Sequence, residues 1–465
     1  MTQNYNTDTA IPDTIFKAYD IRGIVDETLT TDIVYMVGKA LGTENLAGGG
    51  NTINVARDGR LSGPSLLQAL IDGILSTGCN VINVGRVPTP VLYFSSFHLE
   101  TGSGVMLTGS HNPPKYNGLK MVLNGTTLSG GTIQELKQRI LKKDFATGQG
   151  ELKEIDVTED YLNRITNDIK LKRPLNIVVD CGNGVAGELA PKLFKALGCD
   201  VTEMFCEIDG TFPNHHPDPS QPETLEDIIH AVTTEGYDVG FAFDGDGDRL
   251  GVISPSGEII WPDRQMILYA RDILERLPGA EIIYDIKCSR NLDQAISEAG
   301  GKPLMWMTGH SFVKAKLKET GAPLAGEMSG HIFFKERWYG FDDALYTGAR
   351  LLEILSKATQ STGEIFDNLP NSINTPELRL DMNEGEHFDF MKKVQAVASF
   401  DNAKVTTIDG LRVDFEDGWG LARPSNTTPC IVIRFEGDNE TAIERIKNAF
   451  RELFLSVDNT VKLPF

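Results

Sequence analysis

The chain has 465 residues, of which 65 are Asp or Glu and 44 are Lys or Arg, so its formal net charge is −21. A negative field of this size repels nucleic acid and acidic membranes, and we expect neither as a partner. The same field repels phosphorylated small molecules, which therefore bind only where the fold gathers cations locally.

The chain shows no sign of a membrane-spanning or secreted protein. It contains no run of 18 or more apolar residues, so we expect no transmembrane helix. The first residues, MTQNYNTDTAIPDTIF, lack the basic region and the apolar stretch of a signal peptide, so we expect a cytoplasmic protein. The six cysteines form no CxxC pair and match no zinc spacing, which favours reduced, packed thiols.

Short β-branched runs alternate with longer helical patterns over most of the chain. Near the N-terminus, strands over 53–58 and 80–85 enclose an amphipathic helix over 62–78, which begins with a serine cap. Two further cycles predict strands over 175–180, 199–205, 237–244, 281–286 and 303–307, and helices from residue 188, over 263–276 and over 289–299. This alternation predicts βαβ units with mostly parallel pairing.

The last part of the chain has a different pattern. Residues 369–378 contain two prolines and several turn residues, which is typical of a linker. A helix over 387–399, strands within 404–436 and a closing helix from residue 439 follow. We therefore expect an α/β fold of three βαβ-type mixed-sheet domains and a smaller C-terminal α+β domain. The expected domain ranges are 1–154, 155–256, 257–368 and 369–465.

The segment TGSHNPPKYNGLK (108–120) places a serine after a buried strand. A Gly/Pro-stiffened loop there holds Ser110 exposed and fixed in direction, as a nucleophile requires. His111, Lys115 and Lys120 add positive charge or proton donors nearby. A turn in which Ser and Asn only bond the backbone is the alternative, and the residues leave the two readings about even.

The segment FDGDGDR (243–249) follows another buried strand and alternates Asp244, Asp246 and Asp248 with glycines. Three carboxylates so close together repel one another unless a hard cation such as Mg²⁺ or Ca²⁺ compensates them. An EF-hand loop requires Gly at its sixth position and Glu at its twelfth. This chain has Arg249 and Pro255 there, so an EF-hand does not fit. The pattern favours a metal site over a solvated acidic turn, with Arg249 beside the cation.

GNGVAG (182–187) matches a dinucleotide-binding fingerprint, but we interpret it as a tight strand-to-helix turn because it stands alone in mid-chain.

In AGEMSGHIFF (325–334), Glu327, Ser329 and His331 alternate, so in an extended segment they point to one side and can bind sugar hydroxyls. A polar strand edge is the alternative there. ARPSNTTP (422–429) has an arginine followed by hydroxyl side chains in a turn, which suits a phosphate-binding loop. A plain β-turn between two strands is the alternative.

These segments in this order, together with AYDIRG at 18–23, resemble the α-D-phosphohexomutase superfamily, and within it the bacterial phosphomannomutase/phosphoglucomutase group. The resemblance covers essentially the whole chain and implies four domains around a central cleft. In chain order these domains carry the phosphoserine, metal, sugar-recognition and phosphate-binding loops. Gly109 stands where many members carry Ala, and Thr428 stands where many carry Glu. Met328 and His331 favour the mannose/glucose type.

The resemblance also implies roles for individual residues. The catalytic positions correspond to Ser110, which is the phosphoserine, and to Arg22, His111, Lys120, Arg249 and His331. The Mg²⁺ ligands correspond to the phosphate on Ser110, Asp244, Asp246 and Asp248. The substrate-binding positions correspond to Tyr19, Lys287, His310, Glu327, Ser329, His331, Arg423, Ser425, Asn426 and Thr427.

The implied activity is a reversible exchange between hexose 1-phosphate and hexose 6-phosphate of mannose and glucose, through a hexose 1,6-bisphosphate. We expect a monomer with no partner other than these sugar phosphates. The alternatives are a phosphoglucosamine mutase, a sugar phosphatase in which water attacks the phosphoserine, and a catalytically silent sugar-phosphate-binding protein. Intact Ser110 and the three aspartates argue against the silent protein.

Overall fold

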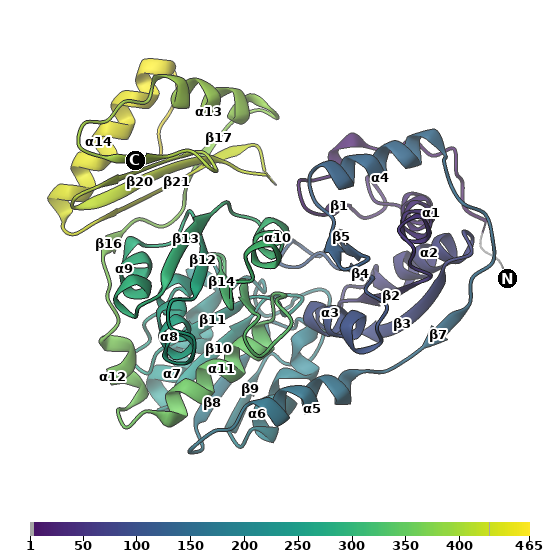
Figure 1. Cartoon of the computed structure of the whole chain (residues 1–465), viewed down its shortest axis with the longest axis horizontal. Coiled ribbons are helices and arrows are strands. Elements are labelled where there is room, and N and C mark those ends of the chain that lie inside the picture. Colours follow the sequence, from purple (N-terminus) through teal and green to yellow (C-terminus); the bar gives the residue numbers. More distant parts are fainter. Residues whose placement is uncertain (1–3, 427) are drawn as a thin grey trace.

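The structure is a computed structural model that describes residues 4–426 and 428–465. Within these residues the strands form four sheets that follow one another along the chain. Figure 1 shows the N-terminal lobe (purple to blue) beside a central body (teal to green), with the C-terminal lobe (yellow) above that body. None of the helices in the described ranges combines the length and the apolar character that crossing a membrane requires.

Unit 1 (residues 13–154) is built on a mixed sheet in the order β1-β5-β4-β2-β3-β7, with β6 paired to β5. β4, β2, β3 and β7 run parallel, and β5 is antiparallel to β4 and β1. The strands are β1 Ile21–Ile24, β2 Thr52–Arg57, β3 Asn80–Arg86, β4 Gly104–Leu107, β5 Tyr116–Leu123, β6 Thr126–Thr127 and β7 Leu152–Glu154. The helices are η1 Asp13–Ile15, α1 Thr31–Ala47, α2 Gly63–Leu75, α3 Thr89–His98 and α4 Gly131–Lys142.

Unit 2 (residues 158–253) has the strand order β11-β10-β8-β9, in which only the β10–β11 hairpin is antiparallel. The strands are β8 Asn176–Asp180, β9 Asp200–Met204, β10 Val239–Phe243 and β11 Leu250–Ile253. The helices are α5 Thr158–Asp168, η2 Val185–Glu188, α6 Ala190–Ala196, η3 Pro222–Leu225 and α7 Glu226–Glu235.

Unit 3 (residues 262–367) repeats this plan in the order β13-β12-β14-β15, and its β14–β15 pair is an antiparallel hairpin. The strands are β12 Glu281–Asp285, β13 Lys302–Trp306, β14 Leu324–Gly326 and β15 Ile332–Phe334. The helices are α8 Pro262–Arg276, α9 Arg290–Glu298, α10 His310–Thr320, α11 Ala344–Lys357 and α12 Thr362–Asp367.

Unit 4 (residues 373–457) is an antiparallel sheet in the order β16-β21-β20-β19-β18, with β17 also paired to β21. The strands are β16 Ile373–Asn374, β17 Leu378–Asp381, β18 Lys404–Thr406, β19 Leu411–Phe415, β20 Gly418–Pro424 and β21 Cys430–Gly437. Helices α13 Glu386–Val397 and α14 Glu440–Val457 cover one face of this sheet (Figure 1). The expected fold class, three α/β domains and a C-terminal α+β domain, is confirmed.

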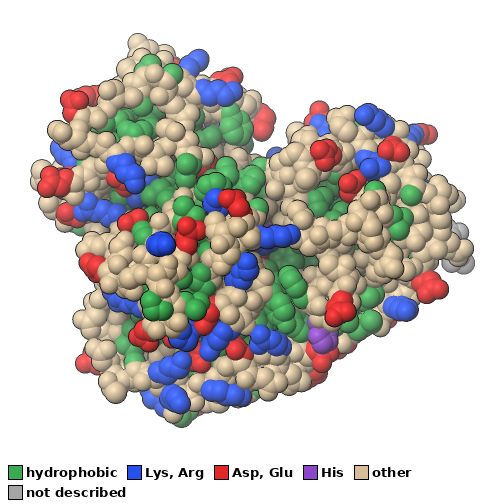
Figure 2. Space-filling view, viewed as in Figure 1, with side chains coloured by type: hydrophobic (Ala, Val, Ile, Leu, Met, Phe, Trp, Pro, Cys, Tyr) green, Lys and Arg blue, Asp and Glu red, His purple; other side chains and the backbone are tan. Residues whose placement is uncertain are grey.

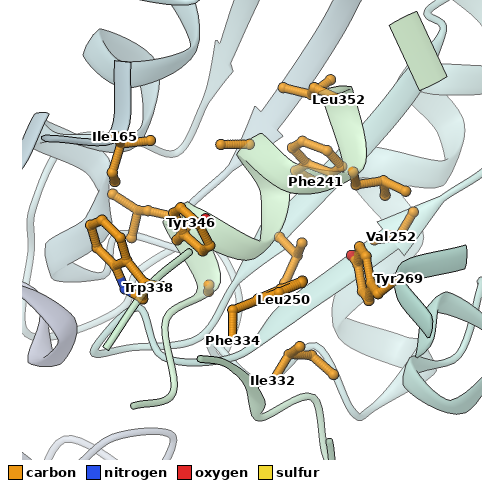
Figure 3. Packing of buried hydrophobic residues seen from close by; sticks show 14 of the residues in the cluster. Ile165, Phe241, Leu250, Val252, Tyr269, Ile332, Phe334, Trp338, Tyr346 and Leu352 are labelled. Carbon is orange, nitrogen blue, oxygen red and sulfur yellow. The ribbon is translucent and has the colours of Figure 1, made fainter. Parts of the chain in front are cut away.

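Units 2 and 3 share one hydrophobic core, to which helix α3 of unit 1 also contributes, whereas unit 4 has a core of its own. Helix α11 lies between the two sheets and is buried along most of its length, as expected of a helix that packs on several sides. Figure 3 shows its Tyr346 and Leu352 among Phe241 and Leu250 of unit 2 and Phe334 of unit 3. The two units therefore form a single packed body.

Three local expectations differ from the structure. Ser62 is the residue before α2, but its hydroxyl accepts from the Asn117 amide at 2.9 Å and does not cap the helix. The segment 327–330 is the turn between β14 and β15 rather than extended chain. The expected linker contains β16, which pairs with β21 because the edge of that sheet offers it backbone partners.

Candidate active site

A cleft of about 660 Å³ lies where the four units meet. It is lined by most of the predicted site residues, namely Tyr19, Arg22, Ser110, His111, Lys120, Arg249, Lys287, His310, Glu327, Ser329, His331, Arg423, Ser425 and Asn426. The aspartates of the 243–249 loop lie beneath Ser110 with no exposed surface. Thr427 is outside the described residues. Segments that are distant in the sequence therefore converge on one cavity.

Ser110 lies just beyond the end of β4, on the loop that leads to β5. Its Oγ donates to Asp244 Oδ2 at 3.1 Å and lies 3.2 Å from His111 Nδ1. The expectation that the loop holds Ser110 exposed is wrong, because the residue is buried at the base of the cleft. Its φ is +49°, in the left-handed region that residues with a Cβ rarely adopt. Backbone strain of this kind is concentrated at functional sites, where the surrounding structure enforces it.

The loop between β10 and β11 carries the three aspartates. Asp246 Oδ2 accepts from Thr89 Oγ1 at 2.5 Å and from Lys120 Nζ at 2.7 Å. Lys120 Nζ also donates to Asp248 Oδ2 at 2.5 Å. Unit 1 thus supplies cations and hydroxyls that hold carboxylates of unit 2, and the two loops are fixed to each other.

The aspartate loop fits a hard cation such as Mg²⁺. Asp244, Asp246 and Asp248 each offer a carboxylate oxygen, and these oxygens lie within 4.8 Å of one another. Among the described residues, Asp246 Oδ1 and Asp248 Oδ1 are buried and have no hydrogen-bond partner. Buried anionic oxygens without a donor are costly, and an oxygen-preferring divalent cation satisfies them.

The three carboxylates of this loop repel one another. Burial, together with the charges of Asp248 and Asp246, raises the pKa of Asp244 to about 7. Burial also acts to raise the pKa of Asp246, but the adjacent Lys120 outweighs it and lowers that pKa below its ordinary value. Lys120 alone therefore does not balance the three carboxylates.

Two arginines offer donors to the cleft. Arg249 pairs with Asp244 through Nε at 3.0 Å and with Asp218 through Nη1 at 3.1 Å. Arg22 donates to Asp20 and to Asn112, each at 2.6 Å. Within the described part of the chain, Arg249 Nη2 and Arg22 Nε are buried without a hydrogen-bond partner, and both residues line the cleft. Unpaired guanidinium donors fit a phosphoryl group.

His331 and His310 lie side by side at the unit 3 wall, with ring centroids 5.6 Å apart. Asp342 Oδ2 is 3.0 Å from His331 Nδ1, and Asp342 Oδ1 accepts from Lys314 Nζ at 3.1 Å. Burial acts to lower the pKa of His331, but Asp248 and Asp342 outweigh it and raise that pKa. Burial and the charge of Lys314 lower the pKa of His310 well below its ordinary value.

The turn between β14 and β15 presents Glu327 and Ser329 to the same cavity. Ser329 Oγ donates to Glu327 Oε2 at 3.1 Å, and the Gly309 N–H donates to Oε1 at 3.2 Å. Burial raises the pKa of Glu327 to about 7. A carboxylate and a hydroxyl side by side provide the acceptors and the donor that vicinal sugar hydroxyls require.

Arg423 and the turn that follows β20 form the wall from unit 4. Arg423 Nε donates to Asp409 Oδ2 at 2.9 Å, and the side chain is almost fully buried. Lys287 of unit 3 lines the same region and pairs with Glu377 at 2.7 Å. A cation beside hydroxyls and backbone N–H groups is suited to a phosphate.

Four family models match successive parts of the chain. They describe the three alpha/beta/alpha domains and the C-terminal domain of phosphoglucomutase/phosphomannomutase and match residues 13–147, 159–257, 261–373 and 377–453. The chain belongs to the phosphoglucomutase/phosphomannomutase family.

Curated relatives of known name are similar over almost the full length. A phosphomannomutase/phosphoglucomutase of Pseudomonas aeruginosa is 53% identical over 455 residues, which are 98% of each chain. A phosphoglucomutase of Neisseria meningitidis serogroup A is 54% identical over 451 residues, covering 96% of this chain and 98% of the relative.

A solved structure of a phosphoglucomutase/phosphomannomutase family protein from Burkholderia thailandensis has a TM-score of 0.94 and 53% identity, and the match covers 98% of this chain and all of that one. The chain is therefore an enzyme of this family.

In this phosphoglucomutase/phosphomannomutase family member, the sequence interpretation missed Arg60, which fixes the Ser110 loop. Its guanidinium donates to the carbonyl oxygens of Ser110 at 2.8 Å, Asn112 at 2.5 Å, Pro113 at 2.7 Å and Tyr116 at 3.0 Å. Arg60 has almost no exposed surface. The sequence could have pointed to Arg60, because it lies just beyond the end of β2. β2 and β4 are parallel neighbours, so the residues that follow these two strands lie at the same edge of the sheet.

Gly109 explains how Arg60 fits against the loop. A Cβ at position 109 would lie 2.4 Å from the guanidinium carbon of Arg60. The glycine at this position thus leaves room for the arginine. Asp58 completes the arrangement, accepting from Arg60 Nε at 3.2 Å and from Thr108 Oγ1 at 2.8 Å.

The GNGVAG turn supports the aspartate loop from behind. The Val185 N–H donates to the Gly245 carbonyl at 3.2 Å. A Cβ at Gly184 would lie 3.0 Å from that same carbonyl oxygen, so glycine is needed for the close approach.

Proposed function

We propose that the chain exchanges a phosphoryl group between the 1- and 6-positions of hexose phosphates through phosphorylated Ser110 and a hexose 1,6-bisphosphate. The observation that carries this proposal is the position of Ser110. Its Oγ lies 3.1 Å from Asp244 in a cleft that is also lined by Arg423 and Ser425 of unit 4. A phosphoryl donor and a second phosphate-binding surface in one cavity are what a 1,6-bisphosphate requires.

In the forward step the bond between phosphorus and Ser110 Oγ breaks, and a bond forms between phosphorus and the free hydroxyl oxygen of the sugar. Arg249 Nη2 and Lys120 Nζ are placed to stabilise the charge on the transferring group. The proton of the sugar hydroxyl moves to a base at the cleft, and Ser110 Oγ takes up a proton as it leaves phosphorus. Arg22, Lys120 and His331 are the candidates for this transfer among the titratable groups that line the cleft. Reversal of the step from the other phosphate restores phosphorylated Ser110.

Asp244, Asp246, Asp248 and the phosphate on Ser110 would hold Mg²⁺, which supplies Lewis-acid stabilisation of the transferring group when bound. Thr89 orients the Asp246 carboxylate that the cation would contact. Asp218 orients Arg249. Burial acts to raise the pKa of Asp218, but the charge of Arg249 and the hydrogen bonds from Ser220 together outweigh burial and lower that pKa.

The two sugars expected as substrates differ only in configuration at C2. Glu327 and Ser329 are placed to bind the 3- and 4-hydroxyls, which mannose and glucose share. Both 1-phosphates should therefore turn over with comparable kcat/KM. A preference of about a thousandfold, or roughly 4 kcal/mol, would contradict this assignment.

A coupled assay tests the proposed function against its alternatives. We expect formation of hexose 6-phosphate from mannose and glucose 1-phosphates, with little free phosphate. Dominant phosphate release would instead identify a sugar phosphatase, and dominant turnover of glucosamine phosphates a phosphoglucosamine mutase. Intact-mass measurement should show one phosphate on the parent chain after treatment with glucose 1,6-bisphosphate and none on Ser110→Ala. A phosphate mapped to another residue would overturn the mechanism.

A further inference from the structure

A second cavity, of about 470 Å³, lies between units 1 and 3 and away from the residues of the catalytic cleft. Helix α3 and the β5–β6 hairpin form one side of it, and helix α10 and the segment 335–341 form the other. Figure 2 shows hydrophobic side chains in the hollow between the two lobes, with Lys and Arg side chains along its edge. Its volume is in the range of small-molecule sites.

Aromatic rings form one wall of this second cavity. Phe97 and Tyr339 have ring centroids 5.0 Å apart, and Tyr339 and Phe341 are parallel with centroids 6.0 Å apart. Tyr93 adjoins Phe341 at 5.6 Å. Phe97 is half exposed, so a large apolar ring faces the cavity rather than a packed core. A flat aromatic ligand stacks favourably on such a surface.

The charge of the second cavity is opposite to that of the molecule. Its lining contains Lys314, Lys318 and Lys335 and no acidic residue, in a chain whose net charge is −21. Lys318 Nζ donates to the Gly125 carbonyl at 3.0 Å and Lys335 Nζ to the Leu317 carbonyl at 3.4 Å. In the described ranges neither of these two lysines has a carboxylate within ion-pairing distance. The ammonium groups of Lys318 and Lys335 can therefore pair with a bound anion.

The lysines also join the two units. Lys318 reaches Gly125 across the cavity, and Lys314 Nζ lies 3.2 Å from the Tyr93 hydroxyl and 4.3 Å from the centre of its ring. Both lysines are on α10, whose first residue, His310, lines the catalytic cleft. A ligand whose anion is held by lysines of unit 3 and whose ring lies on Phe97 of α3 would therefore contact both units.

We propose that this cavity is a second ligand site for a planar aromatic ring that carries an anionic group. The rings of α3 and the 335–341 segment hold the flat part, and Lys318 and Lys335 hold the anion. Nucleoside monophosphates and aromatic carboxylates share this chemistry. The site is separate from the proposed phosphoryl transfer and does not depend on it.

The test uses the full chain and the fluorescent probe 8-anilinonaphthalene-1-sulfonate. We expect saturable binding of one probe per chain, displaced by adenosine monophosphate or by 1-naphthoate but not by uncharged adenosine. The displacer that acts at the lower concentration identifies the source of the ligand. Saturating glucose 1,6-bisphosphate should leave the bound probe in place.

Two variants locate the probe. Lys318→Gln combined with Lys335→Gln should weaken binding at least tenfold, and Ala315→Trp, which fills the cavity from α10, should abolish it. The matched control is Lys392→Gln combined with Lys393→Gln on α13, which removes the same charge far from the cavity. Absence of saturable binding, unchanged binding in both variants, or displacement by the bisphosphate would overturn the proposal.

Discussion

Arg60 holds the Ser110 loop through the main chain. Its planar guanidinium reaches four carbonyl oxygens at once, while Asp58 balances its charge. A lysine in the same place carries the charge but concentrates its donors on one atom. The geometry of the loop therefore depends on the shape of the arginine as well as on its charge.

Arg60→Lys should slow phosphoryl transfer from glucose 1,6-bisphosphate to Ser110 by about ten- to a hundredfold, because hydrogen bonds from a charged donor contribute about 1.5–3 kcal/mol each. Rapid-quench measurement with labelled bisphosphate gives the rate. Arg350→Lys is the matched control, since Arg350 is equally buried but pairs with Asp272 and Glu336 away from the cleft. Equal transfer rates in the two variants would refute the role of Arg60.

Asp246→Asn should weaken Mg²⁺ binding and slow transfer by at least about a hundredfold, because the cation loses an anionic ligand. Titration calorimetry measures the affinity, and circular dichroism checks that the fold is retained. The parent enzyme should lose activity in excess EDTA and regain it when Mg²⁺ is restored. Full activity in EDTA would exclude the metal role of the aspartate loop.

Site residues could be predicted from the sequence where several of them lie together in one short segment. The three aspartates are recognisable because they alternate with glycine after a buried strand, and the structure brings them beneath Ser110. Arg60, Asp218 and Asp342 are not recognisable in this way. Each lies alone in the sequence, and its partner becomes adjacent only when strands or units pack together.

The loop that joins β9 to η3 is held to unit 2 by His215 and Asp180. His215 Nε2 lies 3.0 Å from Asp180 Oδ2. Burial acts to lower the pKa of His215, but the hydrogen bond to Asp180 and the negative charge of Asp180 together outweigh burial and raise that pKa. The folded state thus binds the proton more tightly than the unfolded chain. This stabilisation is complete below the unfolded pKa of about 6.5 and is lost as the pH rises through the folded value.

His215→Gln should therefore lower the midpoint of thermal unfolding more at about pH 6 than at about pH 9. Differential scanning calorimetry at both values measures the difference. His98→Gln is the control, because His98 pairs with Asp160 at the surface, where ion pairs contribute little. The interpretation fails if the two variants show the same dependence on pH.

Elements were predictable where hydrophobic periodicity is strong, as in β10, α8 and α14. The β14–β15 hairpin was not, because an alternating pattern over 325–334 suits one strand as well as two short ones joined by a turn. The positive φ of Gly330 marks the turn. Only the pairing of Gly326 with Ile332 settles where the chain reverses.

The whole molecule combines a rigid body with a lobe attached at one side. Units 2 and 3 share a core, whereas unit 4 is attached to unit 3 by a small apolar cluster of Ile286, Trp419 and Leu421 and by hydrogen bonds to the segment 286–290. Arg412 donates to the carbonyl oxygens of Ile286 and Cys288, and Arg434 to that of Lys287. Because this attachment is separate from the core that units 2 and 3 share, it favours movement of unit 4 relative to the body.

A phosphate bound by Arg423 would draw unit 4 towards the cleft. Arg423→Ala should raise KM about ten- to a hundredfold and increase the release of bisphosphate, because one charge-assisted contact is lost. Small-angle scattering should show compaction of the parent protein on adding glucose 1-phosphate, and less in the variant. Arg445→Ala, on α14 and outside the cleft, is the control. No compaction of the parent, or equal substrate affinity, would contradict this clamp.

The left-handed backbone conformation of Ser110 affects the thermal stability of the protein. A residue with a Cβ in this region costs about 1–2 kcal/mol, whereas glycine adopts it freely. Ser110→Gly should therefore unfold at a higher temperature than Ser110→Ala, although both lack the hydroxyl. Selection for stability alone would favour glycine at position 110. If Ser110 carries the phosphoryl group as proposed, the loop gives up thermal stability at this residue in exchange for activity.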